Sequence, residues 1–435
     1  MPLLHSQHIS GTDFTHVKTM QIYLVGGAVR DRYLNLPSKD QDWVVVGASP
    51  ADMLAAGYKQ VGADFPVFLH PKTQQEYALA RTERKSGHGY QGFVCDFDKN
   101  VTLEEDLLRR DLTINAMAQD DSGKLIDPYG GLQDLHNKVL RHVSPAFAED
   151  PLRVLRVARF AARFAHLGFS IAPQTLELMA DICQQGELAH LTAERVWQET
   201  ERAMAEKSPD VYFRVLQECG ALQVIFPEIA ALFGVPQPEK YHPEIDTGLH
   251  ILMCLQQIRR RSADTRALFA TLTHDLGKAL TPAENWPAHH GHEKLSIKPI
   301  KALCKRLRVP NGHQELALKT AEFHTHAHRA FELRPDTLLD ILKKLDALRK
   351  PDVFALFLLC CEADACGRTG FEDKPYPQAD YLRSALNVIN NIRAEEFVAA
   401  GLSGQAIGQA MDAARVAALS EFKKTWAEEH GHAPH

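Results

Sequence analysis

Two carboxylates separated by one residue are the first side chains in this sequence whose spacing suggests chemistry. Asp40 and Asp42 stand directly before the apolar run Trp43–Val46. Because side chains alternate along a strand, both carboxylates would project from the same face. Like charges held side by side repel each other unless a cation lies between them, and Mg²⁺ prefers carboxylate oxygens. The pair therefore predicts a Mg²⁺ site, and two turn-forming aspartates ahead of a buried strand are the alternative.

A glycine pair precedes these carboxylates and suggests a phosphate site. The expected strand ending in Val25 is followed by Gly26-Gly27 and by a helix-like segment that carries Arg30. Free backbone N–H groups at a helix start bind phosphate, and Arg30 could add a charged hydrogen bond. Neither a Walker A loop nor a G-x-G-x-x-G fingerprint is present, so a tight structural turn is the alternative. Glu76, on a neighbouring expected strand, is the candidate for a third carboxylate.

A third polar group lies in the helix expected after Asp150. Four arginines in this helix recur at spacings of three and four residues, which confines them to one face. They are Arg153, Arg156, Arg159 and Arg163. No acid lies between them in the sequence, so their charges repel each other unless phosphates lie nearby. The alternatives are a solvated face for the arginines and a capping role for Asp150 ahead of Pro151.

The elements that must position these residues divide the chain into two parts. Short β-rich runs alternate with helical patterns up to about residue 140, whereas the chain after Pro151 reads as helix after helix. The expected strands are Tyr23–Val25, Trp43–Val46, Val67–Leu69 and Tyr77–Ala80. The glycine-rich segment Arg84–Gly92 is expected to be a mobile loop, with a plain surface loop as the alternative, and the Pro-rich stretch Pro236–Pro243 is expected to be a linker. This pattern indicates an α/β or α+β head followed by a helical remainder, and of the two we expect the α+β class.

Length and composition indicate a folded protein of several units. The chain has 435 residues, of which 45% are hydrophobic and 24% charged, and this balance excludes disordered and fibrous classes. The net charge is −6, so binding of nucleic acid must use local basic patches. No apolar run approaches the roughly 18 residues of a membrane span. Eight scattered cysteines without a C-x-x-C pair suit a reducing compartment, so a cytoplasmic protein without a membrane partner is expected.

Four ordered motifs resemble those of class II tRNA CCA-adding nucleotidyltransferases, in the bacterial subgroup with an appended HD phosphohydrolase domain. The motifs are Leu24–Asp31, the Asp40-x-Asp42 pair, Arg109–Ala116 and Glu149–Arg153. The resemblance runs from Met20 nearly to the C-terminus. It implies that Asp40 and Asp42 are catalytic and bind Mg²⁺, and that further residues contact the incoming CTP or ATP or the edge of its base. These nucleotide-binding residues are Gly27, Arg30, Arg110, Asp150, Arg153, Arg156 and Arg159.

The resemblance also implies an architecture. A polymerase-beta-like nucleotidyltransferase head with a mixed sheet would span residues 20–140, after an N-terminal extension, residues 1–19, that is expected to be disordered. An all-helical neck with the base-recognition helix (141–245), an HD domain (246–350) and a helical tail (351–435) would follow. The head would add two C residues and one A to the 3′ end of tRNA, releasing pyrophosphate. Monomers and homodimers are both compatible with this interpretation.

The HD domain is implied by a second motif. His274 and Asp275 lie near the end of the run Leu268–Lys278, which is expected to be a helix ending at a glycine. With His250 and later histidines, their order resembles HD-superfamily metal phosphohydrolases. The resemblance implies a site for Ni²⁺, Mn²⁺, Co²⁺ or Mg²⁺, which can activate water against a phosphate ester such as a 2′,3′-cyclic phosphate. The predicted ligands are His250, His274 and Asp275, and the further candidates are His292, His324 and Asp364. Thr325 departs from the His-Asp repeat of related multifunctional CCA proteins.

Two other functions compete with this interpretation. A bacterial poly(A) polymerase shares the head motifs, but the HD segment and the absence of a basic tail count against it. A nucleotide-binding RNA module without catalysis is the second rival, and the presence of Asp40, Asp42 and Arg30 argues against it. A candidate basic patch for the RNA backbone consists of Lys298, Lys301, Lys305, Arg306 and Arg308.

Overall fold

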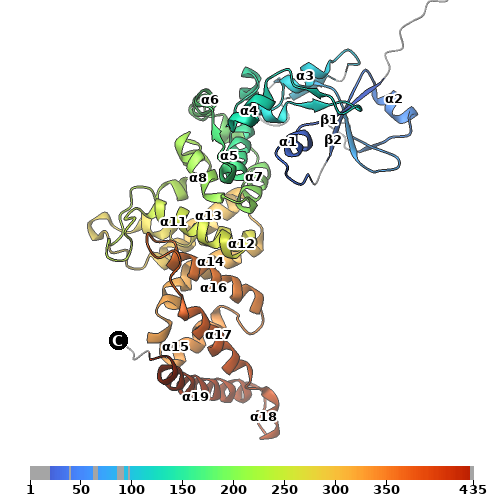
Figure 1. The fold of residues 1–435 in the computed structure, drawn as a ribbon. Helices are drawn as coiled ribbons and strands as arrows, with labels where there is room; N and C mark the ends of the chain where they lie inside the picture. The colour runs from blue at the N-terminus through green and yellow to red at the C-terminus, as the bar shows by residue number, and fades with distance from the viewer. Residues whose placement is uncertain (1–19, 39–40, 62–66, 86–92, 97, 432–435) are drawn as a thin grey trace, which may run out of the picture. The chain divides into compact units, whose positions relative to one another are not determined.

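The structure is a computed structural model that describes residues 20–38, 41–61, 67–85, 93–96 and 98–431. The chain divides into two compact units, whose elements are labelled in Figure 1. One contains the residues up to Asn137 together with Arg141–Glu149, and the other contains Lys138–Leu140 together with Asp150–His435. The expected N-terminal extension, residues 86–92 of the expected glycine-rich loop, and Asp40 lie outside the described residues.

The first unit, the head, is built on a seven-stranded mixed sheet in the order β3-β4-β5-β2-β1-β8-β9. Its strands are β1 (Gln21–Val25), β2 (Asp42–Val46), β3 (Lys59–Val61), β4 (Val67–Leu69), β5 (Glu76–Leu79), β8 (Ala118–Gln119) and β9 (Leu125–Ile126). Strands β2 and β5 pair in parallel, and the other described neighbours pair antiparallel. The predicted α+β class with a mixed sheet is therefore confirmed.

A separate antiparallel pair of strands includes the first two residues of the loop predicted at Arg84–Gly92. It consists of β6 (Thr82–Lys85) and β7 (Phe93–Asp96). Arg84 pairs with Val94 and Lys85 pairs with Phe93, so the expectation that Arg84 and Lys85 belong to a loop is wrong. The glycines that follow these two residues obscured a strand that is completed by a partner eight residues further on.

Both faces of the seven-stranded sheet are covered, which explains the uninterrupted apolar run in β2. Val44 packs in one cluster with Leu107, whereas Val45 packs on the opposite face with Met53. Helices α2 (Pro50–Ala55) and α3 (Leu103–Leu108) supply residues to these two clusters. The other helical elements of the head are α1 (Gly27–Tyr33), α4 (Gly131–Asn137) and the short turns η2 (Thr113–Asn115) and η3 (Pro145–Glu149). This packing leaves the first residue of β2, Asp42, as the exposed end of a buried strand.

The second unit is almost wholly helical, as the sequence predicts. Its helices are α5 (Leu152–Phe164), α6 (Pro173–Gln184), α7 (Ala193–Ala205), α8 (Pro209–Glu218), α9 (Ala221–Ile225), α10 (Pro227–Ala230), α11 (Thr247–Arg261), α12 (Thr265–Thr273), α13 (His292–Leu307), α14 (Asn311–His328), α15 (Pro335–Lys344), α16 (Pro351–Cys366), α17 (Pro377–Asn390), α18 (Ala394–Ala399) and α19 (Gln405–His430). Two short strands, β10 (Val139–Leu140) and β11 (Ser170–Ile171), pair in parallel beside them. Helices α8, α15 and α16 begin at a proline, where the missing N–H costs no hydrogen bond. Across the described residues, the search for a helix long and apolar enough to cross a bilayer finds none.

Candidate active sites

The glycine turn after β1 brings the backbone close to an arginine. Gly26 has a φ of 68°, in the left-handed region that glycine favours, and its N–H donates to Met117 O at 3.1 Å. A Cβ atom at Gly26 would lie 2.8 Å from Arg110 Nη1. The backbone conformation therefore favours glycine, and the absence of a side chain leaves room for the Arg110 guanidinium beside the turn where the sequence predicts a phosphate.

Asp42 lies beside this turn. In the antiparallel pairing of β1 and β2, the partner of Asp42 is Val25, the residue that precedes Gly26. On the other side of β2, the parallel pairing sets Glu76 at the start of the neighbouring strand β5. Both carboxylate-bearing residues are exposed. The predicted metal ligand Asp42 and the predicted phosphate turn thus share one end of adjacent strands, while Asp40 falls outside the described residues.

Buried hydrogen bonds hold the head arginines in place. Arg30 is 3% exposed, and its guanidinium donates to Asn115 of η2. The fully buried Asp106 forms ion pairs with Arg109 at 2.5 Å and with Arg110 at 3.1 Å. Burial raises the pKa of Asp106, but the charges of Arg109 and Arg110 outweigh this effect and hold the pKa below its usual value. The arginines are therefore oriented before any ligand binds.

The arginine stripe of α5 has a partner that the sequence did not reveal. Arg153 and Arg159 are each 8% exposed, so the alternative of a solvated face is wrong for them. Arg159 Nε donates to Glu199 of α7 at 2.7 Å, and Arg156 lies 3.9 Å from the same buried carboxylate. The expectation that these charges repel unless phosphates lie nearby is wrong for Arg156 and Arg159, because the acid comes from another helix.

Asp150 has a local and a tertiary partner. Its Oδ1 accepts the N–H of Leu152 at 3.1 Å, at the start of α5, and its Oδ2 accepts from Arg195 of α7 at 3.0 Å. A capping role at this helix start is therefore present, and the contact with α7 adds a second restraint on the carboxylate. The role in base recognition that the resemblance implies for α5 stays a prediction.

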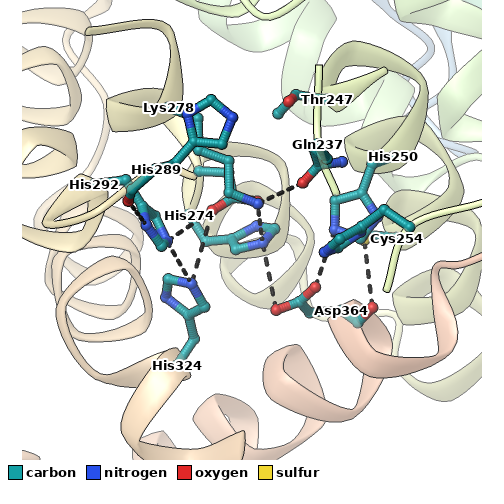
Figure 2. Close-up of polar contacts among 12 residues, drawn as sticks. Gln237, Thr247, His250, Cys254, His274, Lys278, His289, His292, His324 and Asp364 are labelled. Atoms are coloured by element: carbon teal, nitrogen blue, oxygen red, sulfur yellow. Dashed lines mark hydrogen bonds and ion pairs between the residues drawn. The ribbon is translucent and has the colours of Figure 1, made fainter. Parts of the chain in front are cut away.

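In the second unit, one cluster gathers six side chains from five segments (Figure 2). They are His250 of α11, His274 and Asp275 after α12, His292 at the start of α13, His324 of α14 and Asp364 of α16. His250 Nε2 lies 3.0 Å from Asp364 Oδ1, and His274 Nε2 lies 3.2 Å from Asp275 Oδ2. His292 Nε2 lies 3.3 Å from Asp275 Oδ1. The structure thus brings together all the ligand candidates of this region.

The hydrogen bonds of the four imidazoles determine which nitrogen carries the proton. In each ring Nδ1 lies within hydrogen-bonding distance of a backbone carbonyl oxygen, which can only accept. The acceptors are Gly367 O for His250 at 3.0 Å, Thr271 O for His274 at 2.7 Å, His289 O for His292 at 2.8 Å and Thr320 O for His324 at 3.1 Å. In the neutral rings Nε2 therefore carries the lone pair. These nitrogens and the two carboxylates are all electron-pair donors, and such a set fits a divalent cation.

Charge and burial at the cluster also favour a cation. Burial lowers the pKa of His274, but the charges of Asp275 and Asp364 outweigh this effect and raise the pKa well above its ordinary value. Burial, together with the charge of His274, holds the pKa of His324 well below its ordinary value. Within the described part of the chain, His274 Nε2 lies 3.2 Å from Asp275 Oδ2 and 3.5 Å from Asp364 Oδ2, but neither contact has hydrogen-bond geometry. The carboxylates therefore stabilise positive charge among imidazoles that are buried, and a metal ion would supply that charge.

The turn after α12 brings His292 to Asp275. Helix α12 ends at Thr273 and the short turn η6 (Leu276–Leu280) follows, so the expected helix through Gly277 is wrong at its C-terminal end. A Cβ atom at Gly277 would lie 2.1 Å from His292 O. Glycine is therefore required for the close approach of α13, which begins with a candidate ligand.

Several residues that contact the cluster were missed by the sequence analysis. His328 Nε2 lies 2.7 Å from Asp364 Oδ2, and its place one turn after His324 on α14 was the available signal. Gln237 belongs to the expected linker Pro236–Pro243 and Glu244 follows it directly, and the sequence offered no signal for either residue. Two members of the predicted basic patch are ion-paired with acids of α7 and α10. They are Arg306 and Arg308, and the exposed lysines of the patch are Lys298, Lys301 and Lys305.

Comparisons with known proteins also separate a head from a later region that contains the HD cluster. Three family models match: "Poly A polymerase head domain" at residues 22–141, "Probable RNA and SrmB- binding site of polymerase A" at 168–233, and "HD domain" at 247–350. A "Multifunctional CCA protein" of Hahella chejuensis is 60% identical over 94% of this chain and 97% of its own length. Another of that name, from Thioalkalivibrio sulfidiphilus, is 61% identical over 94% of this chain and 100% of its own. A solved CCA-adding enzyme in complex with CTP has the same fold, with 20% identity, a TM-score of 0.62, and coverage of 95% and 92% of the two chains.

Proposed function

We propose a function from one premise: the chain belongs to the family of multifunctional CCA proteins. In this proposal the head rebuilds the CCA end of tRNA. The 3′-hydroxyl of tRNA attacks the α-phosphate of CTP twice and of ATP once, and pyrophosphate leaves each time. The observation that carries the proposal is the register that places Asp42 opposite Val25, beside the glycine turn.

In the head, this chain's own residues would hold the metal ion, contact the phosphates of the nucleotide and keep the glycine turn in place. Asp42, with Asp40, would hold Mg²⁺, which supplies charge stabilisation for the attacking hydroxyl and the leaving pyrophosphate. The exposed Asp42 carboxylate suits a hard cation that arrives with the nucleotide. The backbone at Gly27 and the guanidinium of Arg110 would contact the phosphates, while Arg30 keeps the turn in register through its bond to η2.

We assign base selection to α5. Asp150 and Arg153 would offer an acceptor and a fork of donors to the base edge, so that protein side chains admit C or A and reject G or U. Arg156 and Arg159 would contact the incoming CTP or ATP. Their contacts with Glu199 support this role, because a guanidinium fixed by a buried acid presents its remaining donors in one direction.

The test of the head activity uses tRNA that lacks CCA, with Mg²⁺ and each labelled nucleotide supplied separately. CTP should be incorporated first, ATP only after two C residues, and UTP and GTP not at all. Addition of many A residues without prior C would instead identify a poly(A) polymerase. That rival is disfavoured because the relatives at about 60% identity cover the whole HD region as well as the head. No incorporation of any nucleotide would leave the non-catalytic RNA module as the better account.

We propose a metal-dependent phosphohydrolase activity for the HD domain. His250, His274, Asp275 and Asp364 would hold Ni²⁺, Mn²⁺, Co²⁺ or Mg²⁺, with His292 and His324 on the other side of Asp275, and the ion would activate water against a phosphate ester. A 3′ end blocked by phosphate cannot attack CTP, so removal of phosphate and addition of CCA serve the same tRNA end. The test is hydrolysis of a 2′,3′-cyclic nucleotide across these four metals, and absence of turnover with every metal would contradict the proposal.

Location in the cytoplasm belongs to the same proposal. The described cysteines are buried free thiols, which suit a reducing compartment, and tRNA and nucleoside triphosphates are available there.

A further inference from the structure

The segment that connects the RNA-binding region to the HD domain contains buried polar side chains. Residues 234–246 lie between the two matched family ranges, which end at 233 and begin at 247. The sequence predicts a linker over Pro236–Pro243, yet Gln237 within it is 2% exposed and the side chain of Glu244, the next residue after it, is 3% exposed. In a plain linker, polar side chains are expected to stay exposed to water, because burying them costs free energy unless they form hydrogen bonds or ion pairs. Their partners therefore indicate what the segment does.

Glu244 contacts the metal-site histidine of α11 on the side away from the metal. Its Oε1 lies 3.0 Å from Nδ1 of His250, and the same oxygen lies 3.0 Å from Nδ1 of His242. Nδ1 of His250 also lies 3.0 Å from the carbonyl of Gly367, so this nitrogen carries a proton and has no lone pair for a metal. A carboxylate behind a ligating imidazole fixes the tautomer, orients the ring and makes Nε2 a stronger donor.

Gln237 is connected to Asp275, a carboxylate of the candidate metal site, through Lys278. Lys278 Nζ donates to Gln237 Oε1 at 2.5 Å and lies 2.7 Å from Asp275 Oδ2. The backbone of the segment is held in the same region, since His289 Nε2 lies 2.7 Å from Pro236 O. Figure 2 shows Gln237 and Lys278 beside the cluster, on the side away from Asp364.

We propose that residues 234–246 are a positioning element of the HD metal site, in which Glu244 orients His250 and Gln237 orients Asp275 through Lys278. Neither Glu244 nor Gln237 touches the substrate or the metal in this proposal. The inference rests on the proposed metal site, and it goes beyond that site by making metal affinity depend on the chain that joins the RNA-binding region to the HD domain.

The test measures Co²⁺ binding to the full chain by visible absorption. The signal of the HD site is the absorption that the parent shows and a His274→Ala/Asp275→Ala double variant lacks. Glu244→Ala should weaken Co²⁺ binding by about 10- to 100-fold, the usual effect of losing a partner behind a ligating imidazole. Glu244→Gln should lose less, because the amide oxygen still accepts the proton of Nδ1. Gln237→Leu should weaken binding independently of Glu244, by loosening Lys278.

Glu239→Gln is the matched control, since Glu239 is an exposed acid in the same segment. It should bind Co²⁺ as the parent does. CTP incorporation and thermal unfolding check that each variant is folded, and Glu244→Gln keeps the test informative if Glu244→Ala does not fold. Parental Co²⁺ affinity in Glu244→Ala and Gln237→Leu would overturn the positioning role while leaving the metal site standing. If the parent and the double variant absorb alike, the metal site itself fails, and the positioning role fails with it.

Discussion

The two candidate sites are built in different ways. The head places its carboxylate at the exposed end of a strand, beside a turn formed by the preceding strand of the same sheet. The HD site gathers donors from five segments between residues 250 and 364, and most of these side chains are buried. The exposed carboxylate of Asp42 suits an ion that binds and leaves together with its nucleotide, whereas a buried set of imidazoles and carboxylates suits a resident ion. In the proposed function, one chain would therefore combine a head site that exchanges its nucleotide at each addition with an HD site that keeps its metal.

The largest effect is expected from Asp42→Ala. The loss of a metal ligand removes several kcal/mol of transition-state stabilisation, so CTP incorporation should fall by ~10³-fold or more. Hydrolysis of a 2′,3′-cyclic nucleotide should stay at the parental rate, because the HD donors are separate. The assay is incorporation of labelled CTP into tRNA without CCA. Undiminished CTP incorporation would show that Asp42 does not hold a catalytic metal in the head. Glu284→Ala, at an exposed site, is the control.

A stability measurement probes the buried acid behind the head arginines. Asp106→Asn leaves Arg109 and Arg110 without their counter-ion, and such a change should lower the free energy of unfolding by about 3 kcal/mol. The folded-state pKa of Asp106 lies below 3.8, so the charge contribution is present above about pH 4 and is lost as pH falls through that lower value. Urea unfolding of parent and variant at pH 7 and pH 3 would measure it. Equal stability at pH 7 would show that the arginines are oriented by other contacts.

Base choice should respond to Asp150→Ala and Arg153→Ala. A mismatched buried donor or acceptor costs about 1–3 kcal/mol, so discrimination against UTP and GTP should weaken by roughly 5- to 100-fold. Asp150→Ala also removes the bond to the N–H of Leu152, so Asp150→Asn, which keeps an acceptor there, separates capping from base selection. Full discrimination in all three variants would leave α5 with a structural role.

The smallest effect is expected from Thr325→Ala. The sequence raised the concern that threonine replaces a carboxylate at this position, but Asp364 of α16 provides a second carboxylate to the cluster. Thr325 Oγ1 lies 3.4 Å from His324 Nε2, a weak contact, so cyclic-nucleotide hydrolysis should change by less than about threefold. Asp364→Asn is the comparison variant and should lose most of the hydrolysis. A large loss in Thr325→Ala would mean that the hydroxyl belongs to the donor set.

Local patterns were enough to predict the strands of the head, whereas the partners of the arginines in α5 and of the HD histidines come from distant segments. Short runs of β-prone residues bounded by turn residues identify β1, β2, β4 and β5, and the carboxylate and the glycine turn become neighbours because adjacent strands pair. The counter-ion Glu199 lies 40 residues from Arg159, and helical spacing within α5 could not reveal it. Asp364 was hard to place because α16 is apolar on all sides, so its sequence does not indicate which face meets the histidines. Glu244 and Gln237 lie among prolines. The composition of this stretch predicts a linker, and only the tertiary structure shows that the two side chains contact residues of the HD cluster.

The proposed function has two separate sites on one chain, and the His274→Ala/Asp275→Ala double variant distinguishes them. Parent and variant are compared in two assays, hydrolysis of a 2′,3′-cyclic nucleotide with Ni²⁺, Mn²⁺, Co²⁺ or Mg²⁺, and incorporation of CTP into tRNA that lacks CCA. We expect the variant to lose metal-dependent hydrolysis by ~10³-fold and to keep parental CTP incorporation, because the ion that would activate water is lost while the head is unchanged. Equal hydrolysis by parent and variant, or loss of both activities in a folded variant, would contradict this expectation.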